Sequence, residues 1–419
     1  MLDLLLLQGR LLNQDGTITA ANIGIQNGVI TDIAPNLMGS AKITLDIQQC
    51  LVSPPFVDSH IHLDSALTAG QPRWNQSGTL FEGIEIWGDR KSALSLEDVK
   101  QRAISTLKQQ ATLGTLFVRS HADVSEPRFI ALQALLEVRA IVKPWLTLQV
   151  IAFPQDGIYG NPTNETLLEK AIEMGADGVG GIPHYELTRE DGVRSINRIF
   201  ELAATYDRLI DIHCDEIDDE QSRFLEVIVA NAIRMGMGER VTASHTTAFG
   251  SYNNAYATKL LGFLRRTNMN LVANPLINIT LQGRADTYPK RRGVTRVKEL
   301  WQQGTNVSFG HDCIQDPWYA LGTGSMLDVA HMGLHVCQMT GMEEINACYN
   351  MITWNGAKTL HVQNQYGVEV GKPANLIVLD ARDRYDALRR KPVVNYVISQ
   401  GKLLARTESP RVMWHRAED

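Results

Sequence analysis

The chain has 419 residues, 44% of them hydrophobic and 21% charged, which is the composition of an ordinary globular protein. A formal net charge of −6 without a run of Lys or Arg argues against a nucleic-acid-binding surface, and no apolar stretch approaches membrane-spanning length. The apolar start, residues 1–7, contains Asp3 and no basic segment, which predicts a strand and not a signal peptide. Five scattered cysteines without a CxxC pair favour free thiols in a reducing cytoplasm.

Residues 1–54 contain short strand-like runs separated by turn signals. Asn27-Gly28 lies inside an alternating segment and predicts a hairpin turn. Strand-like runs with turn signals occur again near the end of the chain, in residues 371–380 and 396–404. We therefore predict one small β-sandwich domain that is built from both chain ends, residues 1–54 and 361–419.

Residues 55–360 alternate between apolar strand-like runs and longer helical patterns. One helix is expected after Ser95, a suitable N-cap, because an apolar stripe follows at helical spacing. Apolar strands separated by helices indicate a parallel sheet covered by helices, and eight such units predict a (β/α)8 TIM barrel as the catalytic domain. The predicted strands are the run around His60 and residues 116–121, 146–153, 178–182, 209–213, 241–245, 271–273 and 307–309.

Potential metal ligands stand where several of these strands end. His60 and His62 are two residues apart and therefore point to the same face of a strand. Later strands end at or near His213, His245 and Asp312. Because the chemistry of such a barrel lies at the C-terminal strand ends, we predict a site formed by His60, His62, His213 and Asp312, which suits one Zn²⁺ or Fe²⁺ ion and an activated water.

Two neighbouring residues are candidates for proton transfer. Glu216 lies three residues beyond His213 and is favoured over Asp215, which belongs to an acidic run typical of a solvated face. His245 is either a further metal ligand or the group that holds or deprotonates the attacking water together with Asp312. The strand at 178–182 has no lysine that could bridge a second metal, which favours a mononuclear site.

Further residues near strand ends are candidates for the surroundings of the site. The amide of Gln155 suits the edge of a ring that carries N–H next to C=O. Trp318 is either a wall for a planar substrate or loop packing. Leu80 and Phe81 suit a pocket lid. The remaining candidates, expected at the rim or behind the ligands, are His121 and His184.

The motifs resemble those of the amidohydrolase superfamily and, within it, the bacterial cytosine deaminase family, over nearly the whole chain. The His-x-His pair is typical of the superfamily, whereas the longer strings are specific to the family. They lie at residues 54–64, 71–83, 153–155, 213–222, 243–247, 288–293, 310–312 and 316–318.

The resemblance implies a single metal, iron or zinc, bound by His60, His62, His213 and Asp312. It implies Glu216 as the proton shuttle to the ring nitrogen, and His245 with Asp312 as the pair that activates the water. It places Gln155 and Trp318 at the substrate, and it implies a homo-oligomer.

One position departs from the family pattern: Cys313 stands where the family has a second aspartate after the metal-binding one. A thiol is smaller and less polar than a carboxylate and leaves room beside ring carbons 4 and 5. Burying a methyl group there is worth roughly 1 kcal/mol, whereas a charged neighbour would oppose it. We therefore predict attack of a metal-generated hydroxide at carbon 4 of cytosine or 5-methylcytosine, giving uracil or thymine and ammonia.

Two alternatives follow from the same residues. The substrate is another cyclic amidine, such as isocytosine, isoguanine or creatinine, or the chain is a metal-free binding protein on a barrel scaffold. Intact metal ligands and proton-transfer residues favour the enzyme.

Overall fold

A computed structural model describes residues 1–410, 413 and 414. The chain forms two compact units. The first comprises Met1–Pro55, Ala111–Gly114 and Gln365–Asp419, and the second comprises Phe56–Gln110 and Thr115–Asn364. The domain limits expected at residues 54 and 360 stay a prediction.

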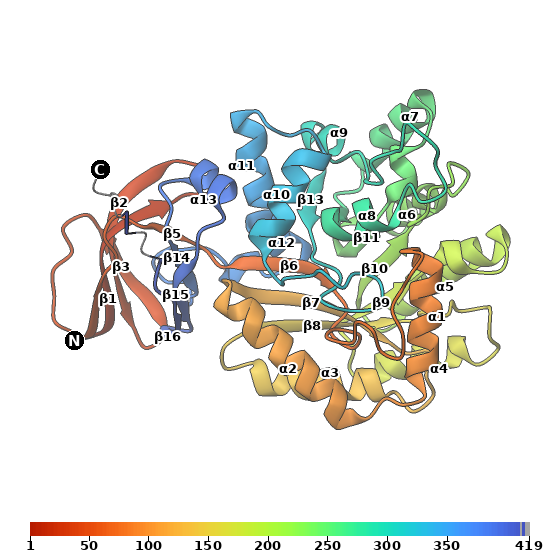
Figure 1. The fold of residues 1–419 in the computed structure, drawn as a ribbon, viewed down its shortest axis with the longest axis horizontal. Coiled ribbons are helices and arrows are strands. Elements are labelled where there is room, and N and C mark those ends of the chain that lie inside the picture. The colour runs from red at the N-terminus through yellow and green to blue at the C-terminus, as the bar shows by residue number, and fades with distance from the viewer. Residues whose placement is uncertain (411–412, 415–419) are drawn as a thin grey trace, which may run out of the picture. The chain divides into compact units, whose positions relative to one another are not determined.

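The larger unit is built on eight parallel strands that follow one another in chain order around the sheet (Figure 1). They are β6 (Phe56–Ile61), β7 (Thr115–Asp123), β8 (Thr147–Phe153), β9 (Gly178–Gly181), β10 (Leu209–Cys214), β11 (Val241–His245), β12 (Asn270–Ala273) and β13 (Asn306–Phe309). Nearly all of their residues are buried, as expected for a parallel sheet covered by helices. The predicted barrel strands are thus confirmed.

The ring is closed by backbone contacts between the first strand and the segment after the last one. The N–H of His62 donates to the carbonyl of Asp312 at 3.0 Å, and the N–H of Asp312 donates to the carbonyl of His60 at 2.8 Å. These bonds hold the start and end of the barrel together at its C-terminal edge. They also bring Asp312 next to the His-x-His pair, although about 250 residues separate them in the sequence.

Helices follow the strands in the larger unit (Figure 1). The expected helix after Ser95 is confirmed, since the Ser95 hydroxyl accepts from the N–H of Asp98 at 3.2 Å. The α-helices of this unit are α1 (Leu80–Lys91), α2 (Leu96–Thr112, whose last residues belong to the smaller unit), α3 (Ile130–Val142), α4 (Asn164–Glu173), α5 (Arg189–Thr205), α6 (Phe224–Met235), α7 (Asn254–Leu264), α8 (Pro275–Leu281), α9 (Val297–Gln302), α10 (Met326–Val336), α11 (Met342–Met351) and α12 (Trp354–Thr359).

The smaller unit joins both chain ends in one eight-stranded sheet, which confirms the predicted terminal β-domain. Strand β1 lies inside this sheet and pairs with β2 antiparallel and with β4 and β5 parallel. The elements of the unit are β1 (Leu2–Leu12), β2 (Ile18–Gln26), β3 (Val29–Ala34), β4 (Ala41–Asp46), β5 (Leu51–Ser53), β14 (Leu376–Leu379), α13 (Arg384–Arg390), β15 (Val394–Ser399) and β16 (Lys402–Arg406).

Two turns of this unit each contain a pair of residues with positive φ. Asn27 and Gly28 have φ values of 51° and 80°, so the predicted hairpin turn is confirmed. The segment 396–404, expected to belong to this sheet, forms most of β15 and β16. Gln400 and Gly401, with φ values of 48° and 77°, form the intervening turn, and Gln-Gly is a weaker turn signal than Asn-Gly.

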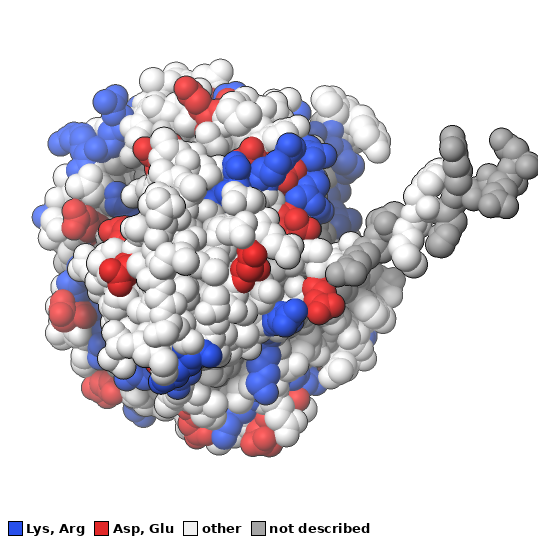
Figure 2. All heavy atoms as spheres, turned by 90° about the vertical axis from the view of Figure 1, so that its left-hand side faces the viewer, with Lys and Arg blue, Asp and Glu red and all other residues white. Residues whose placement is uncertain are grey.

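On the face shown in Figure 2, basic and acidic side chains are both present, with broad uncharged areas between them. Such a mixed surface differs from the single-sign surface typical of nucleic-acid-binding domains. Among the described residues, no helix is long and apolar enough to cross a membrane.

Candidate active site

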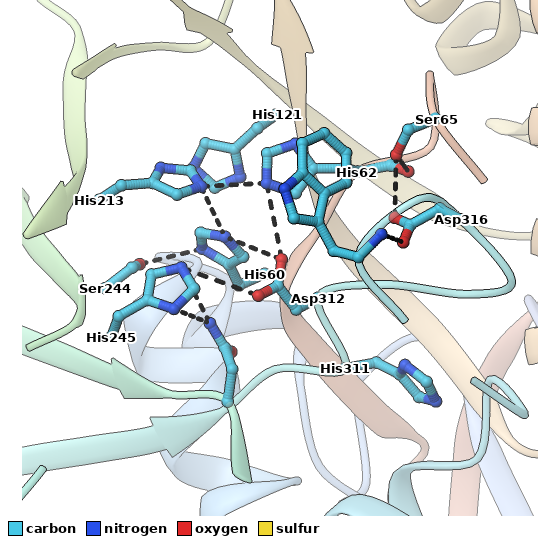
Figure 3. Close-up of polar contacts among 12 residues, drawn as sticks. His60, His62, Ser65, His121, His213, Ser244, His245, His311, Asp312 and Asp316 are labelled. Atoms are coloured by element: carbon cyan, nitrogen blue, oxygen red, sulfur yellow. Dashed lines mark hydrogen bonds and ion pairs between the residues drawn. The ribbon is translucent and has the colours of Figure 1, made fainter. Parts of the chain in front are cut away.

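Three imidazoles and one carboxylate converge at the C-terminal end of the barrel (Figure 3). Nε2 of His213 lies 3.2 Å from Nε2 of His60 and 3.0 Å from Nε2 of His62. Oδ1 of Asp312 lies 3.6 Å from Nε2 of each of His60 and His62. Ligands about 2.0–2.1 Å from a tetrahedral metal lie about 3.3 Å from one another. The observed spacing therefore fits one ion held by the three imidazoles, with Asp312 beside His60 and His62.

The protonation states of this group also fit a cation. Burial and the neighbouring imidazoles lower the pKa of His60, His62 and His213 well below its usual value. The rings are therefore neutral, and each keeps one unprotonated nitrogen that can bind a cation. Burial raises the pKa of Asp312 well above the usual range, so this carboxyl gains strongly from a positive partner. This donor set suits a divalent metal ion.

His245, at the end of β11, lies between two carboxyl groups. Its Nδ1 is 3.1 Å from Oε1 of Glu216, and its Nε2 is 3.8 Å from Oδ2 of Asp312. The amide of Asn278 approaches the same Nδ1 at 3.0 Å. Burial by itself lowers the pKa of His245. The combined attraction of the nearby Glu216 and Asp312 carboxylates is the larger effect, and the pKa is therefore raised above its usual value. The ring is therefore poised to hold a proton beside Glu216.

The side chains of Glu216 and its neighbour Asp215 lie in different surroundings. Glu216 lines the cavity next to the ligand cluster. The carboxylate of Asp215 is buried instead at the start of α6, where it accepts from the N–H groups of Phe224 at 3.0 Å and Leu225 at 2.9 Å. The expectation that Asp215 belongs to a solvated face is wrong, because its carboxylate binds N–H groups that have no partner within the first turn of the helix.

A small cavity opens next to the ligands. Of the predicted substrate residues, Leu80, Gln155, Cys313 and Trp318 line it. Apolar walls with a few polar groups among them are typical of sites for small ring compounds. The complete lining is His62, Leu80, Gln155, Ile182, His213, Glu216, Ile277, Leu281, Asp312, Cys313 and Trp318.

Cys313 contributes an uncharged wall to this cavity. Its side chain is 3% exposed, and burial followed by the nearby Asp312 and Asp316 carboxyl groups raises the pKa of the thiol well above its usual value. Cys313 is therefore a neutral thiol. Asp316 accepts hydrogen bonds from the N–H of Trp318 at 3.0 Å and from the hydroxyl of Ser65 at 3.0 Å, and Figure 3 shows the contact with Ser65. Asp316 therefore fixes the loop that carries Cys313 and Trp318.

Other predicted residues lie outside the cavity lining. Phe81 is 52% exposed, because consecutive helix residues point about 100° apart and Leu80 already faces the cavity. Its position therefore does not support a role as lid. His121 lies behind the ligands, with its ring centroid 4.1 Å from that of His60. His184 does not line the cavity either.

Sequence reasoning missed three apolar residues of the lining, Ile182, Ile277 and Leu281. Ile182 is the last residue of the strand predicted at 178–182, which was an available signal. Ile277 and Leu281 lie on α8, four residues apart and thus on one helix face, but nothing in the sequence tells this face from one that packs on the barrel.

A model of the amidohydrolase family matches residues 44–405. N-isopropylammelide isopropyl amidohydrolase of Pseudomonas sp. strain ADP is 29% identical over 92% of this chain and 94% of its own length. Pterin deaminase of Rhizobium rhizogenes is 27% identical over 92% of this chain and 88% of its own length.

Among solved structures, 5-methylcytosine deaminase from Klebsiella pneumoniae liganded with phosphonocytosine is similar along almost its whole length. The two sequences are 46% identical, the TM-score is 0.94, and the match covers 98% of this chain and 100% of the other.

Proposed function

The chain belongs to the amidohydrolase family, and we propose that it is a metal-dependent deaminase that converts 5-methylcytosine to thymine and cytosine to uracil, with release of ammonia. The similarity to the Klebsiella pneumoniae deaminase supports this reaction. The observation that carries the substrate assignment is the neutral Cys313 thiol in the wall of a cavity that Glu216 also lines.

In this proposal the three converging imidazoles and Asp312 hold one Fe²⁺ or Zn²⁺ ion, which supplies an activated water at neutral pH. Glu216 moves protons to the ring nitrogen and then to the leaving amine. His245, whose Nδ1 lies 3.1 Å from Glu216, supports the charge of that carboxylate during transfer when the imidazole is protonated.

The remaining cavity residues position the base. The Gln155 amide offers a donor and an acceptor to the N–H and C=O edge of a pyrimidine. Trp318 and Leu80 cover its faces, and their apolar surface excludes water. A 5-methyl group would meet the Cys313 thiol instead of a carboxylate, which removes the cost of pressing a methyl group against a charge.

The test is steady-state deamination of 5-methylcytosine and cytosine by the metal-loaded wild type, Cys313→Asp and Cys313→Ser. We expect 5-methylcytosine to react at least as well as cytosine. Cys313→Asp should lower the ratio of kcat/KM for the methylated over the plain base by roughly 10-fold or more, in the range that one methyl group supplies in a pocket. Cys313→Ser, which adds no charge, should keep most of that ratio.

The outcomes separate the parts of the proposal. A strong preference for cytosine that Cys313→Asp leaves unchanged would refute the role of Cys313. If neither base reacts while metal is bound, the substrate assignment fails, and isocytosine, isoguanine and creatinine in the same assay identify the alternative. Sedimentation of the purified protein tests the homo-oligomer that the family resemblance implies.

A further inference from the structure

His60 is held from behind by two residues that the mechanism does not use. Its Nδ1 lies 3.0 Å from Oγ of Ser244 (Figure 3), and the Ser244 hydroxyl donates to Oδ1 of Asp211 at 2.7 Å. All three side chains are fully buried, with exposures of 0%. A continuous set of contacts therefore runs from Asp211 in β10, through Ser244 in β11, to the imidazole whose other nitrogen faces the predicted metal position.

The direction of these hydrogen bonds follows from the groups involved. A serine hydroxyl has one hydrogen to donate, and a carboxylate oxygen can only accept. Because Ser244 gives its hydrogen to Asp211, its oxygen is left to accept from His60. His60 must then carry its hydrogen on Nδ1, and its Nε2 presents a lone pair toward His213 and Asp312.

Asp211 is itself fixed by a buried arginine. Nη1 of Arg119 donates to Oδ2 of Asp211 at 2.9 Å, and Nη2 donates to the carbonyl of Thr359 at 2.7 Å. Nε2 of His121 lies 3.5 Å from Oδ1, farther than the Ser244 hydroxyl. Oδ1 therefore remains directed at Ser244, and the buried charge of Asp211 is balanced by Arg119 without the help of the metal.

We propose that Ser244 and Asp211 are positioning residues of the metal centre, which fix His60 as its Nδ1–H tautomer and aim Nε2 at the ion. Histidine ligands commonly donate their second N–H to such a partner, and losing the partner weakens metal binding about 10–100-fold. This inference rests on the proposed metal site but not on which base is deaminated.

The test compares the affinity of wild type, Ser244→Ala and Ser308→Ala for Zn²⁺, measured by competition with a chromogenic chelator. Ser308 is a matched control, because it is also a fully buried barrel serine, but its hydroxyl contacts Thr359 and no metal ligand. We expect the dissociation constant of Ser244→Ala to rise about 10–100-fold and that of Ser308→Ala to stay at the wild-type value.

Equal Zn²⁺ affinity of Ser244→Ala and wild type, or an equal loss in Ser308→Ala, would overturn the inference. If Ser244→Ala does not fold, long-range ¹H–¹⁵N spectra of the histidine-labelled, metal-free wild type decide, with the His60 signals assigned by their loss in His60→Gln. An Nδ1–H tautomer supports the inference, and an Nε2–H tautomer refutes it. A wild type that binds no Zn²⁺ would overturn the metal centre itself, which is a distinguishable failure.

Discussion

Nδ1 of His245 lies 3.1 Å from Oε1 of Glu216, and both side chains are buried at the C-terminal end of the barrel. Glu216 also lines the cavity, whereas His245 does not. We therefore expect Glu216→Gln, which keeps the shape but cannot carry the proton, to lower kcat about 10²–10⁴-fold. Bound metal per chain should stay at the wild-type level, because Glu216 is not among the four converging ligands. Deamination rates and metal content of the same samples check both statements.

Asp215→Asn is the matched control for this variant. Asp215 accepts two helix N–H groups at the start of α6, so its loss should lower the melting temperature and cost about 1–3 kcal/mol of stability, with little change in kcat of the folded enzyme. A loss of kcat as large as that of Glu216→Gln, at an unchanged melting temperature, would show that the proton-transfer role has been assigned to the wrong carboxylate.

The barrel and the ligands were predictable because each strand carries its signal locally. Period-2 spacing puts His60 and His62 on one face, and the end of an apolar run marks His213 and Asp312. The arrangement behind the ligands was not predictable in the same way. Ser244 meets His60 across 184 residues of sequence, and no local pattern pairs them. Asp211, a charged residue inside an apolar strand on the face of His213, was the one available signal.

Removal of the metal should destabilise the fold as well as abolish activity. A ligand that binds only the folded chain, at 100 times its dissociation constant, contributes about 2.7 kcal/mol. Dialysis against a chelator should therefore lower the melting temperature by several degrees, and addition of Zn²⁺ or Fe²⁺ should restore both properties. Full turnover by protein with almost no bound metal would contradict the proposed centre.

Gly83 in α1 leaves room for the indole of Trp318, since a Cβ at this position would lie 2.3 Å from Cδ1 of that ring. Gly83→Ala should therefore displace Trp318 from the cavity wall and lower kcat/KM several-fold, despite the higher helix propensity of alanine. Gly88, in the same helix, has no atom within 4 Å of such a Cβ. Gly88→Ala should keep full activity and gain up to about 1 kcal/mol of stability. Equal kinetics of the two variants would remove Trp318 from the substrate site.

The carboxylate of Asp386 stabilises the smaller unit through charged hydrogen bonds. It accepts from Arg390 at 2.9 Å and from Arg389 at 3.0 Å, and the bond from Arg390 contributes most to holding its pKa well below the usual range. The pKa is lower in the folded chain than in the unfolded one, so the stabilisation is present above about pH 4 and is lost as pH falls through the folded value.

Asp386→Asn should therefore lower the free energy of unfolding by about 1–3 kcal/mol at pH 7, and this difference should shrink progressively as the pH falls below about 4. Glu369→Gln is the matched control in the same unit. The Glu369 side chain is 64% exposed in its pair with Lys372, and loss of such a surface pair should cost at most about 1 kcal/mol. Denaturant unfolding of both variants at pH 7 and at acidic pH measures these differences. A cost for Asp386→Asn that is no larger than that of Glu369→Gln, or that does not change with pH, would show that the arginine bonds of Asp386 add nothing to stability.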